Sequence, residues 1–348
     1  MNGLTVLICT AHRPARLQAL LRSIADDQTR PTDLQLIVVD NSHDASAAPV
    51  LTDCPFPING VHLLKPNIAD ARNLALAHVQ TDVALFLDDD QLVPPDFFAA
   101  LDHAWRGRPA WASGLRLGVQ PAPEPGADPR FAAAGVTLLP AAHPVTRKEF
   151  ATNGVLLTSP CVSAPHRHEN AWRPIGSLGR AFPPLPRERG GRPSRRLPLT
   201  RPAFTALGTA PFDPCFGLTG GEDTEFFVRL SRLGYRLTYR PDVVALERIP
   251  AARATVLHLL KTGFRTGMTD AMIACRSEGQ STLDYALDAL KHLANGVVLA
   301  STSSAIGRSP EPTDVMQVSR FFGKAFALLG GRWEPYRPAH MRGNRRGS

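Results

Sequence analysis

The fold is decided by the stretch Ala84-Leu85-Phe86-Leu87-Asp88-Asp89-Asp90-Gln91-Leu92-Val93-Pro94, in which an apolar run leads directly into three carboxylates. A short apolar run of this kind indicates a fully buried strand. The acid triplet then lies at the C-terminal end of that strand, which is where ligands bind in open α/β sheets. Carboxylate oxygens suit Mg²⁺ or Mn²⁺, and such ions commonly bridge to substrate phosphates. Taken alone, the triplet is equally consistent with a solvated acidic loop.

The residues before this stretch alternate between predicted strands and predicted helices. Strands are predicted at Leu4–Cys9, Leu36–Val39 and Val61–Leu64. One helix is predicted to begin at Pro14, because proline is pre-organised for the first helical turn, and another covers Ile68–Val79. This alternation predicts a parallel sheet with helices on its faces.

Polar residues follow three of the predicted strands at the points where the strands end. They are Thr10 and Arg13, then Asp40, then Asp88, Asp89 and Asp90. This placement matches a nucleotide site across the tips of parallel strands. No GxGxxG follows the first strand and no Walker lysine loop is present, so the common dinucleotide and P-loop motifs are absent.

Cysteine usage and hydropathy suggest the compartment. The five cysteines are scattered and form no CxxC pair, so neither a disulfide framework nor a zinc site is indicated. The N-terminus lacks the basic and apolar regions of a signal peptide, and no apolar run approaches the roughly 18 residues of a membrane span. We therefore expect a cytoplasmic protein, with peripheral attachment to the inner face of the cytoplasmic membrane as an open alternative.

The net charge of +8 is concentrated in two segments of the chain. Residues 165–201 hold nine Arg and two Glu, and residues 331–348 hold five Arg and one Glu, which leaves −3 for the rest. A nucleic-acid-binding module more often carries its basic residues on a folded face, so nucleic acid is not an expected partner. Anionic lipid headgroups or phosphorylated substrates are better candidates.

Four segments of the chain, in this order and spacing, resemble the family 2 glycosyltransferases of the GT-A fold. They are Thr5–Arg13, Ile37–Asp44, Asn67–Asn73 and Phe86–Asp90. The resemblance implies an α/β fold with a Rossmann-like, mostly parallel sheet. It also implies a nucleotide-diphosphate sugar donor (UDP-, GDP- or dTDP-linked) and Mn²⁺ or Mg²⁺. One departure is Asn67, where the family usually has Gly, although asparagine tolerates left-handed backbone better than most residues.

The resemblance further implies roles for single residues. Asp40 would hold the base or ribose, Asp88 the ribose, and Asp90 the metal that bridges the diphosphate. Arg72 would lie near the phosphates, and Asp89 would be a bystander or a backbone anchor. The residues assigned to the nucleotide sugar are thus Thr10, Arg13, Asp40, Arg72, Asp88 and Asp89, and those assigned to the metal are Asp90 and Asp88.

A second acidic cluster, Gly220-Gly221-Glu222-Asp223, is predicted to open a helix. Acids in a first helical turn also stabilise the helix dipole, which is the alternative explanation. Sugar transfer to a hydroxyl requires removal of its proton, and a carboxylate can do this. The quartet resembles the acceptor-side motif of inverting GT-A enzymes, so Asp223 is assigned as general base, with Glu222 as runner-up or acceptor ligand. Asn153 is a further acceptor-side candidate, or simply a turn residue.

We predict three regions: a GT-A catalytic domain at 1–250, a helical region at 251–335 and a basic tail at 336–348. The catalytic domain carries a Pro- and Arg-rich insert at 165–202, which is either a lid or a passive loop. The last strands of the domain are expected at Tyr235–Tyr239 and Val243–Leu246. The C-terminal helices either pack on the domain or lie on an anionic membrane surface. His258, in the first of them, is a structural residue or a third metal ligand.

The leading hypothesis is therefore a metal-dependent, inverting glycosyltransferase that acts on a lipid-linked or envelope glycan acceptor. One alternative is a sugar-phosphate nucleotidyltransferase, but that class has a Gly-rich, Arg- or Lys-bearing loop after the first strand, which Thr10–Pro14 does not supply. The other alternative is a non-catalytic glycan-binding protein that kept the fold. The retained carboxylates at Asp90 and Asp223 argue against it.

Overall fold

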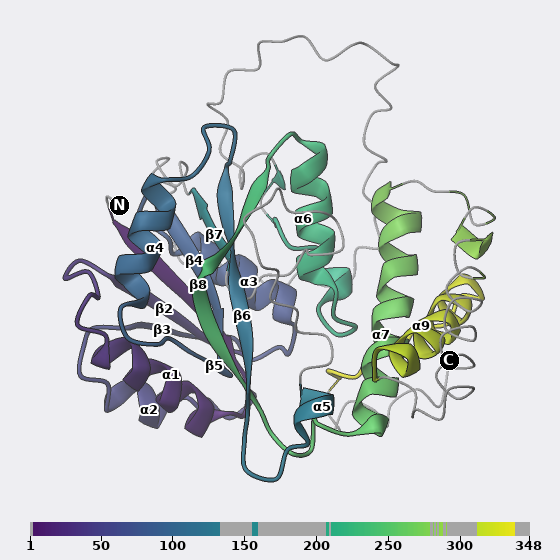
Figure 1. Ribbon diagram of the computed structural model, residues 1–348, viewed down its shortest axis with the longest axis horizontal. Helices are drawn as coiled ribbons and strands as arrows, with labels where there is room; N and C mark the ends of the chain where they lie inside the picture. The colour runs from purple at the N-terminus through teal and green to yellow at the C-terminus, as the bar shows by residue number, and fades with distance from the viewer. Residues whose placement is uncertain are drawn as a thin grey trace.

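The computed structural model describes residues 3–132, 155–158, 207–208, 210–278, 281, 283, 285–287, 290 and 312–337. Its strands form one sheet in the order β3-β2-β1-β4-β7-β6-β8-β5 (Figure 1). The parallel half consists of β1 Leu4–Thr10, β2 Gln35–Asp40, β3 Asn59–His62 and β4 Val83–Asp88. The other half consists of β5 Gln91–Leu92, β6 Gly114–Pro123, β7 Val155–Thr158 and β8 Leu237–Ile249. In this half β6 and β8 are parallel, whereas β7 and β5 are antiparallel to their neighbours.

The register of the parallel strands brings three predicted site residues to one edge of the sheet. Thr10 pairs with Asp40 between β1 and β2, and Cys9 pairs with Asp88 between β1 and β4. Nearly all residues of these strands are buried, as expected where helices cover both faces of a parallel sheet. The strands therefore deliver their polar C-terminal residues to a common edge.

Helices cover both faces of this sheet (Figure 1). They are α1 Pro14–Asp26, α2 Ala48–Thr52, α3 Ile68–Ala77, α4 Phe97–Arg106 and α6 Glu222–Arg232. The short helix α5 Pro129–Ala132 packs instead near Ile249 at the end of β8. Helices α1 and α4 pack into one hydrophobic cluster with one face of the strands, and α3 and α6 pack into another with the opposite face. Pro14 occupies the first turn of α1 and Glu222 opens α6, which confirms both predicted helix starts.

The C-terminal helices α7 Val256–Ile273 and α9 Pro312–Leu328 pack against each other, and a π-helical turn at Ala274–Glu278 follows α7. Their backbones touch at glycines. A Cβ atom added to Gly267 would lie 2.0 Å from the carbonyl oxygen of Arg320, and one added to Gly323 would lie 1.9 Å from that of Phe264. This close approach fixes how α9 lies on α7.

The final part of the sheet differs from the prediction. Tyr235–Tyr239 and Val243–Leu246 were expected as two strands, but Leu237–Ile249 forms the single strand β8. Its pairing with β6 shifts register where Leu117 faces Arg240 and Gly118 faces Val244. A bulge of this kind accommodates the intervening proline without ending the strand.

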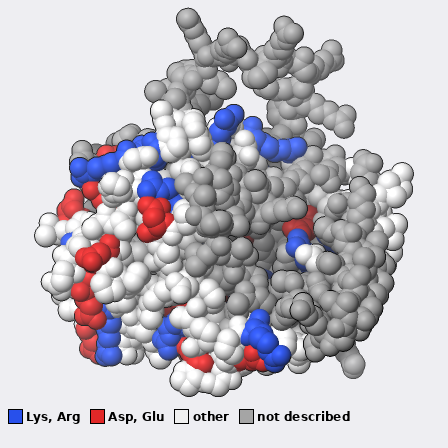
Figure 2. Space-filling view, viewed as in Figure 1, with Lys and Arg blue, Asp and Glu red and all other residues white. Residues whose placement is uncertain are grey.

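Among the helices of the described residues, none combines the length and apolar character needed to cross a membrane. Charged side chains of both signs are interspersed over the described part of the face shown in Figure 2. The Pro- and Arg-rich insert at 165–202 and most of the basic tail lie outside the described residues.

Candidate active site at the strand tips

The acid triplet forms the tight turn between β4 and the short strand β5. Strand β5 pairs with β8, and the backbone N–H of Arg248 donates to the carbonyl oxygen of Asp90 at 2.9 Å. The side-chain oxygen of Gln91 accepts from the backbone N–H of Asp88 at 3.0 Å. The turn is thus fixed from two sides, so the three carboxylates point in set directions.

Asp89 holds the loop that follows β1. Its carboxylate accepts from the Thr10 hydroxyl at 2.8 Å and from the Arg13 guanidinium at 3.0 Å. Burial raises the pKa of Asp89, and Arg13 opposes that shift. The structure thus places Asp89 between Thr10 and Arg13, in contact with both.

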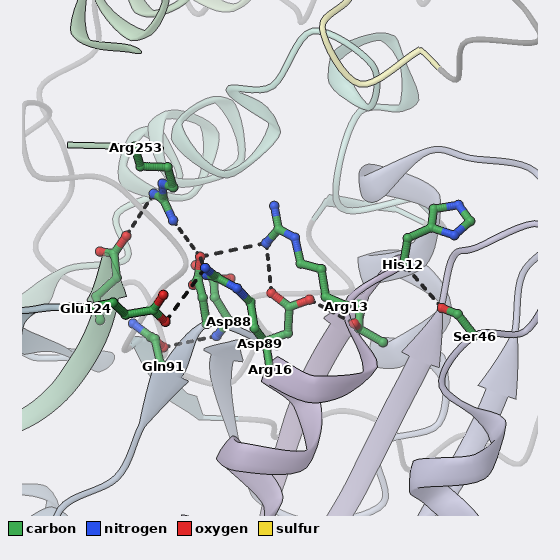
Figure 3. A network of polar contacts seen from close by, with 12 residues as sticks. His12, Arg13, Arg16, Ser46, Asp88, Asp89, Gln91, Glu124 and Arg253 are labelled. Atoms are coloured by element: carbon green, nitrogen blue, oxygen red, sulfur yellow. Dashed lines mark hydrogen bonds and ion pairs between the residues drawn. The ribbon is translucent and has the colours of Figure 1, made fainter. Parts of the chain in front are cut away.

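Asp90 lies among three guanidinium groups. Its Oδ2 is 2.7 Å from Arg253 Nη1, 3.5 Å from Arg16 Nη1 and 3.7 Å from Arg13 Nη1 (Figure 3). The second nitrogen of Arg253 contacts Glu247 at 3.0 Å. Sequence reasoning missed Arg16 and Arg253. Arg16 lies one helical turn after the quoted Thr5–Arg13 segment, but no sequence signal could have placed Arg253, which is 163 positions from Asp90.

Arg72, on α3, links the two acidic clusters. Its guanidinium forms a close ion pair with Glu222 at the start of α6, and its other terminal nitrogen lies 3.5 Å from Asp88. Burial disfavours its charge, but the carboxylates of Glu222 and Asp88 outweigh burial and raise the pKa of Arg72. Arg72 is therefore a buried bridge between the acid triplet and the carboxylates at the start of α6.

Asp88 lies near other carboxylates. Burial raises the pKa of Asp88 to about 7; Arg72 opposes this shift, while the carboxylates of Asp90 and Glu247 add to it. Burial likewise raises the pKa of Glu222. A divalent cation would relieve such a concentration of hard oxygen donors, so Asp88 and Asp90 fit Mn²⁺ or Mg²⁺.

Asp40 and Asn67 organise the neighbouring loops. Both oxygens of the buried Asp40 carboxylate accept backbone N–H groups, from Ser42 at 2.9 Å and from Ala47 at 2.7 Å. Asn67 has extended backbone (φ −168°). The expectation that asparagine replaces the usual glycine here because it tolerates left-handed backbone is therefore wrong. It is the N-cap of α3, and its side chain accepts from the backbone N–H of Asp70.

The acceptor-side quartet turns sharply into α6. Gly220 and Gly221 have φ values of +79° and +87°, in the left-handed region that favours glycine. Glu222 is buried against Arg72, whereas Asp223 is only half-buried, and its carboxylate accepts the N–H of Thr224 at 2.6 Å. Of the two acids, Asp223 is thus the more accessible to a ligand.

Of the two remaining candidates, only His258 is among the described residues. His258 lies in the first turn of α7, where burial and then Arg253 lower its pKa. In the described residues, one group of three side chains has ligand atoms close enough to share a metal ion: His12, His43 and Asp44, all exposed. That group contains neither His258 nor the acid triplet. Asn153 lies outside the described residues.

The sequence and the fold are similar to those of known proteins. The family described as "Glycosyl transferase family 2" matches residues 5–124. The chain is 29% identical to the succinoglycan biosynthesis protein ExoM of Rhizobium meliloti (strain 1021) over 268 residues, which cover 75% of this chain and 72% of ExoM. Its fold is similar to that of the mannosyltransferase PcManGT from Pyrobaculum calidifontis, solved with GDP-Man and Mn²⁺. For that pair the TM-score is 0.58 and the identity 17%, with coverage of 94% of this chain and 88% of the other.

Proposed function

We propose that this chain is a family 2 glycosyltransferase that moves a sugar from a nucleotide-diphosphate donor to a glycan or glycolipid hydroxyl, with inversion; the family match, the similarity to ExoM and the GT-A-like fold support this. The observation that carries the proposal is the bridge formed by Arg72. One guanidinium contacts Asp88 on the strand-tip side and Glu222 on the acceptor side. The two acidic clusters thus belong to one site, as a single-displacement transferase requires.

The donor half of the site is assigned to the strand tips. Asp90 and Asp88 would hold Mn²⁺ or Mg²⁺, and the ion would offset the charge that grows on the departing nucleoside diphosphate. Arg13 and Arg16 lie beside Asp90 and supply positive charge at the same edge. The GDP-Man and Mn²⁺ bound by PcManGT support a donor of this class.

The acceptor half is assigned to the start of α6. The Glu222 carboxylate is buried and held by Arg72, so it is less accessible to an acceptor hydroxyl than Asp223 is. Asp223 is next to it, is only half-buried, and lies in the first turn of the helix at the edge of the site. We assign Asp223 as the general base that takes the proton of the attacking hydroxyl, while Glu222 positions Arg72.

The acceptor class rests on the similarity to ExoM, whose name places it in succinoglycan biosynthesis. An exopolysaccharide or envelope glycan under assembly, free or lipid-linked, is the acceptor that we propose for this chain. Helix α7 packs against α6, since Ile273 and Val228 share a hydrophobic cluster, and α9 packs on α7. An extended acceptor would run along this side of the molecule.

A screen of nucleotide sugars with Mn²⁺ tests the function directly. A donor that binds the native state raises its melting temperature, and we expect one UDP-, GDP- or dTDP-sugar to do so only when Mn²⁺ is present. The product made from that donor should have the anomeric configuration opposite to the donor, as seen by NMR. A retained configuration would exclude the single displacement, and a chain that neither binds nor turns over any donor would exclude the function.

A further inference from the structure

The segment after α9 returns to the candidate active site, although it lies more than 200 residues beyond the residues that match the family. The N–H of Trp333 donates to Met268 Sδ at 3.2 Å, and the Trp333 ring packs on Phe264 of α7. The N–H of Tyr336 donates to the carbonyl oxygen of Leu218 at 3.2 Å. Residues 332–337 are thus attached both to α7 and to the loop that leads into α6.

A second contact with that loop comes from the first residue of the segment. The Arg332 guanidinium donates to the carbonyl oxygen of Cys215 at 2.5 Å and forms an ion pair with Glu334 at 3.0 Å. Glu334 in turn pairs with Arg337. These contacts fix the course of the segment on both sides of Tyr336.

Tyr336 lies directly against the turn of the acceptor-side quartet. A Cβ atom added to Gly220 would lie 3.2 Å from the Tyr336 ring and 2.7 Å from Arg265 Nη1. The Arg265 guanidinium donates to the Tyr336 hydroxyl at 2.7 Å, which sets the orientation of the ring. Tyr336 nevertheless stays 49% exposed, so part of the ring is open to a ligand.

The same tyrosine has an electrostatic effect on Arg13. Burial lowers the pKa of Arg13, but Asp89 and Asp90 outweigh it and raise that pKa, and Tyr336 adds to the rise. Arg13 contacts the acid triplet, whereas Gly220 belongs to the acceptor-side turn. The Tyr336 side chain therefore borders the turn at Gly220 directly, and its relation to Arg13 is electrostatic.

We propose that Tyr336, held by Arg265, binds the sugar ring of the acceptor by stacking. The attacking hydroxyl of the acceptor is thereby presented to Asp223. The Arg265 guanidinium lies over the Tyr336 ring, 5.7 Å from its centroid, and the ring stays partly exposed. An exposed aromatic surface with a polar edge suits a pyranose ring, which has an apolar C–H face and a polar rim. The guanidinium has five N–H donors, and those not used on Tyr336 can bind ring hydroxyls. This inference rests on the proposed function, because it places the acceptor beside the proposed base.

The test uses p-nitrophenyl β-D-hexopyranosides as acceptor probes on the full chain. We expect Tyr336→Ala to raise the KM for the probe about tenfold, the loss of one stacking contact. Calorimetric binding of the nucleoside diphosphate with Mn²⁺ should stay within about threefold of wild type. Tyr336→Phe keeps the ring but loses the hydroxyl, so its KM for the probe should lie between those of wild type and Tyr336→Ala. Phe322→Ala, which removes an exposed ring on α9, is the matched control and should leave both quantities unchanged.

Saturation-transfer NMR of the probe bound to the chain, with nucleoside diphosphate and Mn²⁺ present, reads the contact without turnover. We expect weaker transfer to the ring protons of the probe in Tyr336→Ala than in wild type. Equal probe KM and equal saturation transfer in the two proteins would overturn the inference and leave the proposed function standing. A wild-type chain that binds probe but turns over no donor would instead remove the proposed function.

Discussion

Arg253 Nη1 lies 2.7 Å from Asp90 Oδ2, and Nη2 of the same guanidinium lies 3.0 Å from Glu247 Oε1. One arginine from the turn after β8 thus bridges a carboxylate of the β4–β5 turn and a carboxylate of β8. Its positive charge sits beside the oxygen to which we assign the metal. A divalent cation bound by Asp90 must therefore compete with Arg253, or displace it.

Removal of that guanidinium should change metal affinity and stability in opposite directions. We expect Arg253→Ala to bind Mn²⁺ several-fold more tightly in the absence of donor, measured by calorimetry, because a competing charge is gone. Without metal the variant should lose about 1 kcal/mol of unfolding free energy, since Asp90 and Glu247 lose a partner. Arg130→Ala breaks an exposed ion pair with Asp128 and is the control. Unchanged Mn²⁺ affinity would show that Arg253 does not compete.

Asp90→Asn tests the metal assignment itself. Replacement of the carboxylate by an amide removes the charged ligand, so donor binding should lose its dependence on Mn²⁺, with an affinity lower by about tenfold or more. Calorimetry with the donor found in the thermal screen gives this value with and without Mn²⁺. Asp128→Asn, a carboxylate on the surface, should behave as wild type. The assignment fails if Asp90→Asn binds donor with wild-type affinity and metal dependence.

Two substitutions at the start of α6 should separate the base from the positioning acid. Asp223→Asn should keep donor affinity but slow transfer by about 10²–10⁴-fold, the usual contribution of a general base. Glu222→Gln should instead lower the free energy of unfolding by about 1–3 kcal/mol, because buried Arg72 loses its charged partner. Single-turnover kinetics and urea unfolding give the two quantities. If Glu222→Gln alone abolishes transfer in a stable protein, the roles are reversed.

The raised pKa of Asp88 predicts how stability depends on pH. This pKa is about 7 in the folded chain against 3.8 as the ordinary value, so between these values the folded state holds a proton that the unfolded state has released. The stabilisation is fully present below about pH 4 and is lost as the pH rises through about 7. Urea unfolding across this window should show a shallower decline for Asp88→Asn than for wild type. Asp128→Asn should keep the wild-type slope, and equal slopes in all three would contradict the assignment.

Close packing of α7 on α9 should make Gly267 intolerant of a side chain. An added Cβ would lie 2.0 Å from a backbone oxygen of α9, so Gly267→Ala must separate the helices and should cost about 3 kcal/mol. Gly234→Ala is the matched control: its φ is +89° but the space is open, so only backbone strain of about 1 kcal/mol is expected. Thermal unfolding compares the two. A Gly267→Ala protein as stable as the control would mean that the helices have room to part.

Much of the fold was predictable from local pattern. The buried strands before Asp40 and Asp88, the helix start at Pro14 and the opening of α6 at Glu222 each follow from apolar runs, proline and glycine in the chain. Such signals involve only a few neighbouring residues, so they can be interpreted without knowledge of distant contacts. The strand β8 was divided in the prediction, because a bulge that absorbs a proline depends on the partner strand.

The sequence by itself determined which carboxylates gather at the strand tips, because parallel strands end at one edge and the residues that follow them must meet there. Only the tertiary structure decided which cations those carboxylates face. Arg72 reaches Glu222 across 150 positions, Arg253 reaches Asp90 across 163, and Tyr336 reaches the turn at Gly220 from the far end of the chain. Ion pairs and ring contacts over such separations are set by how helices pack on the sheet, and no local pattern of residues encodes that packing.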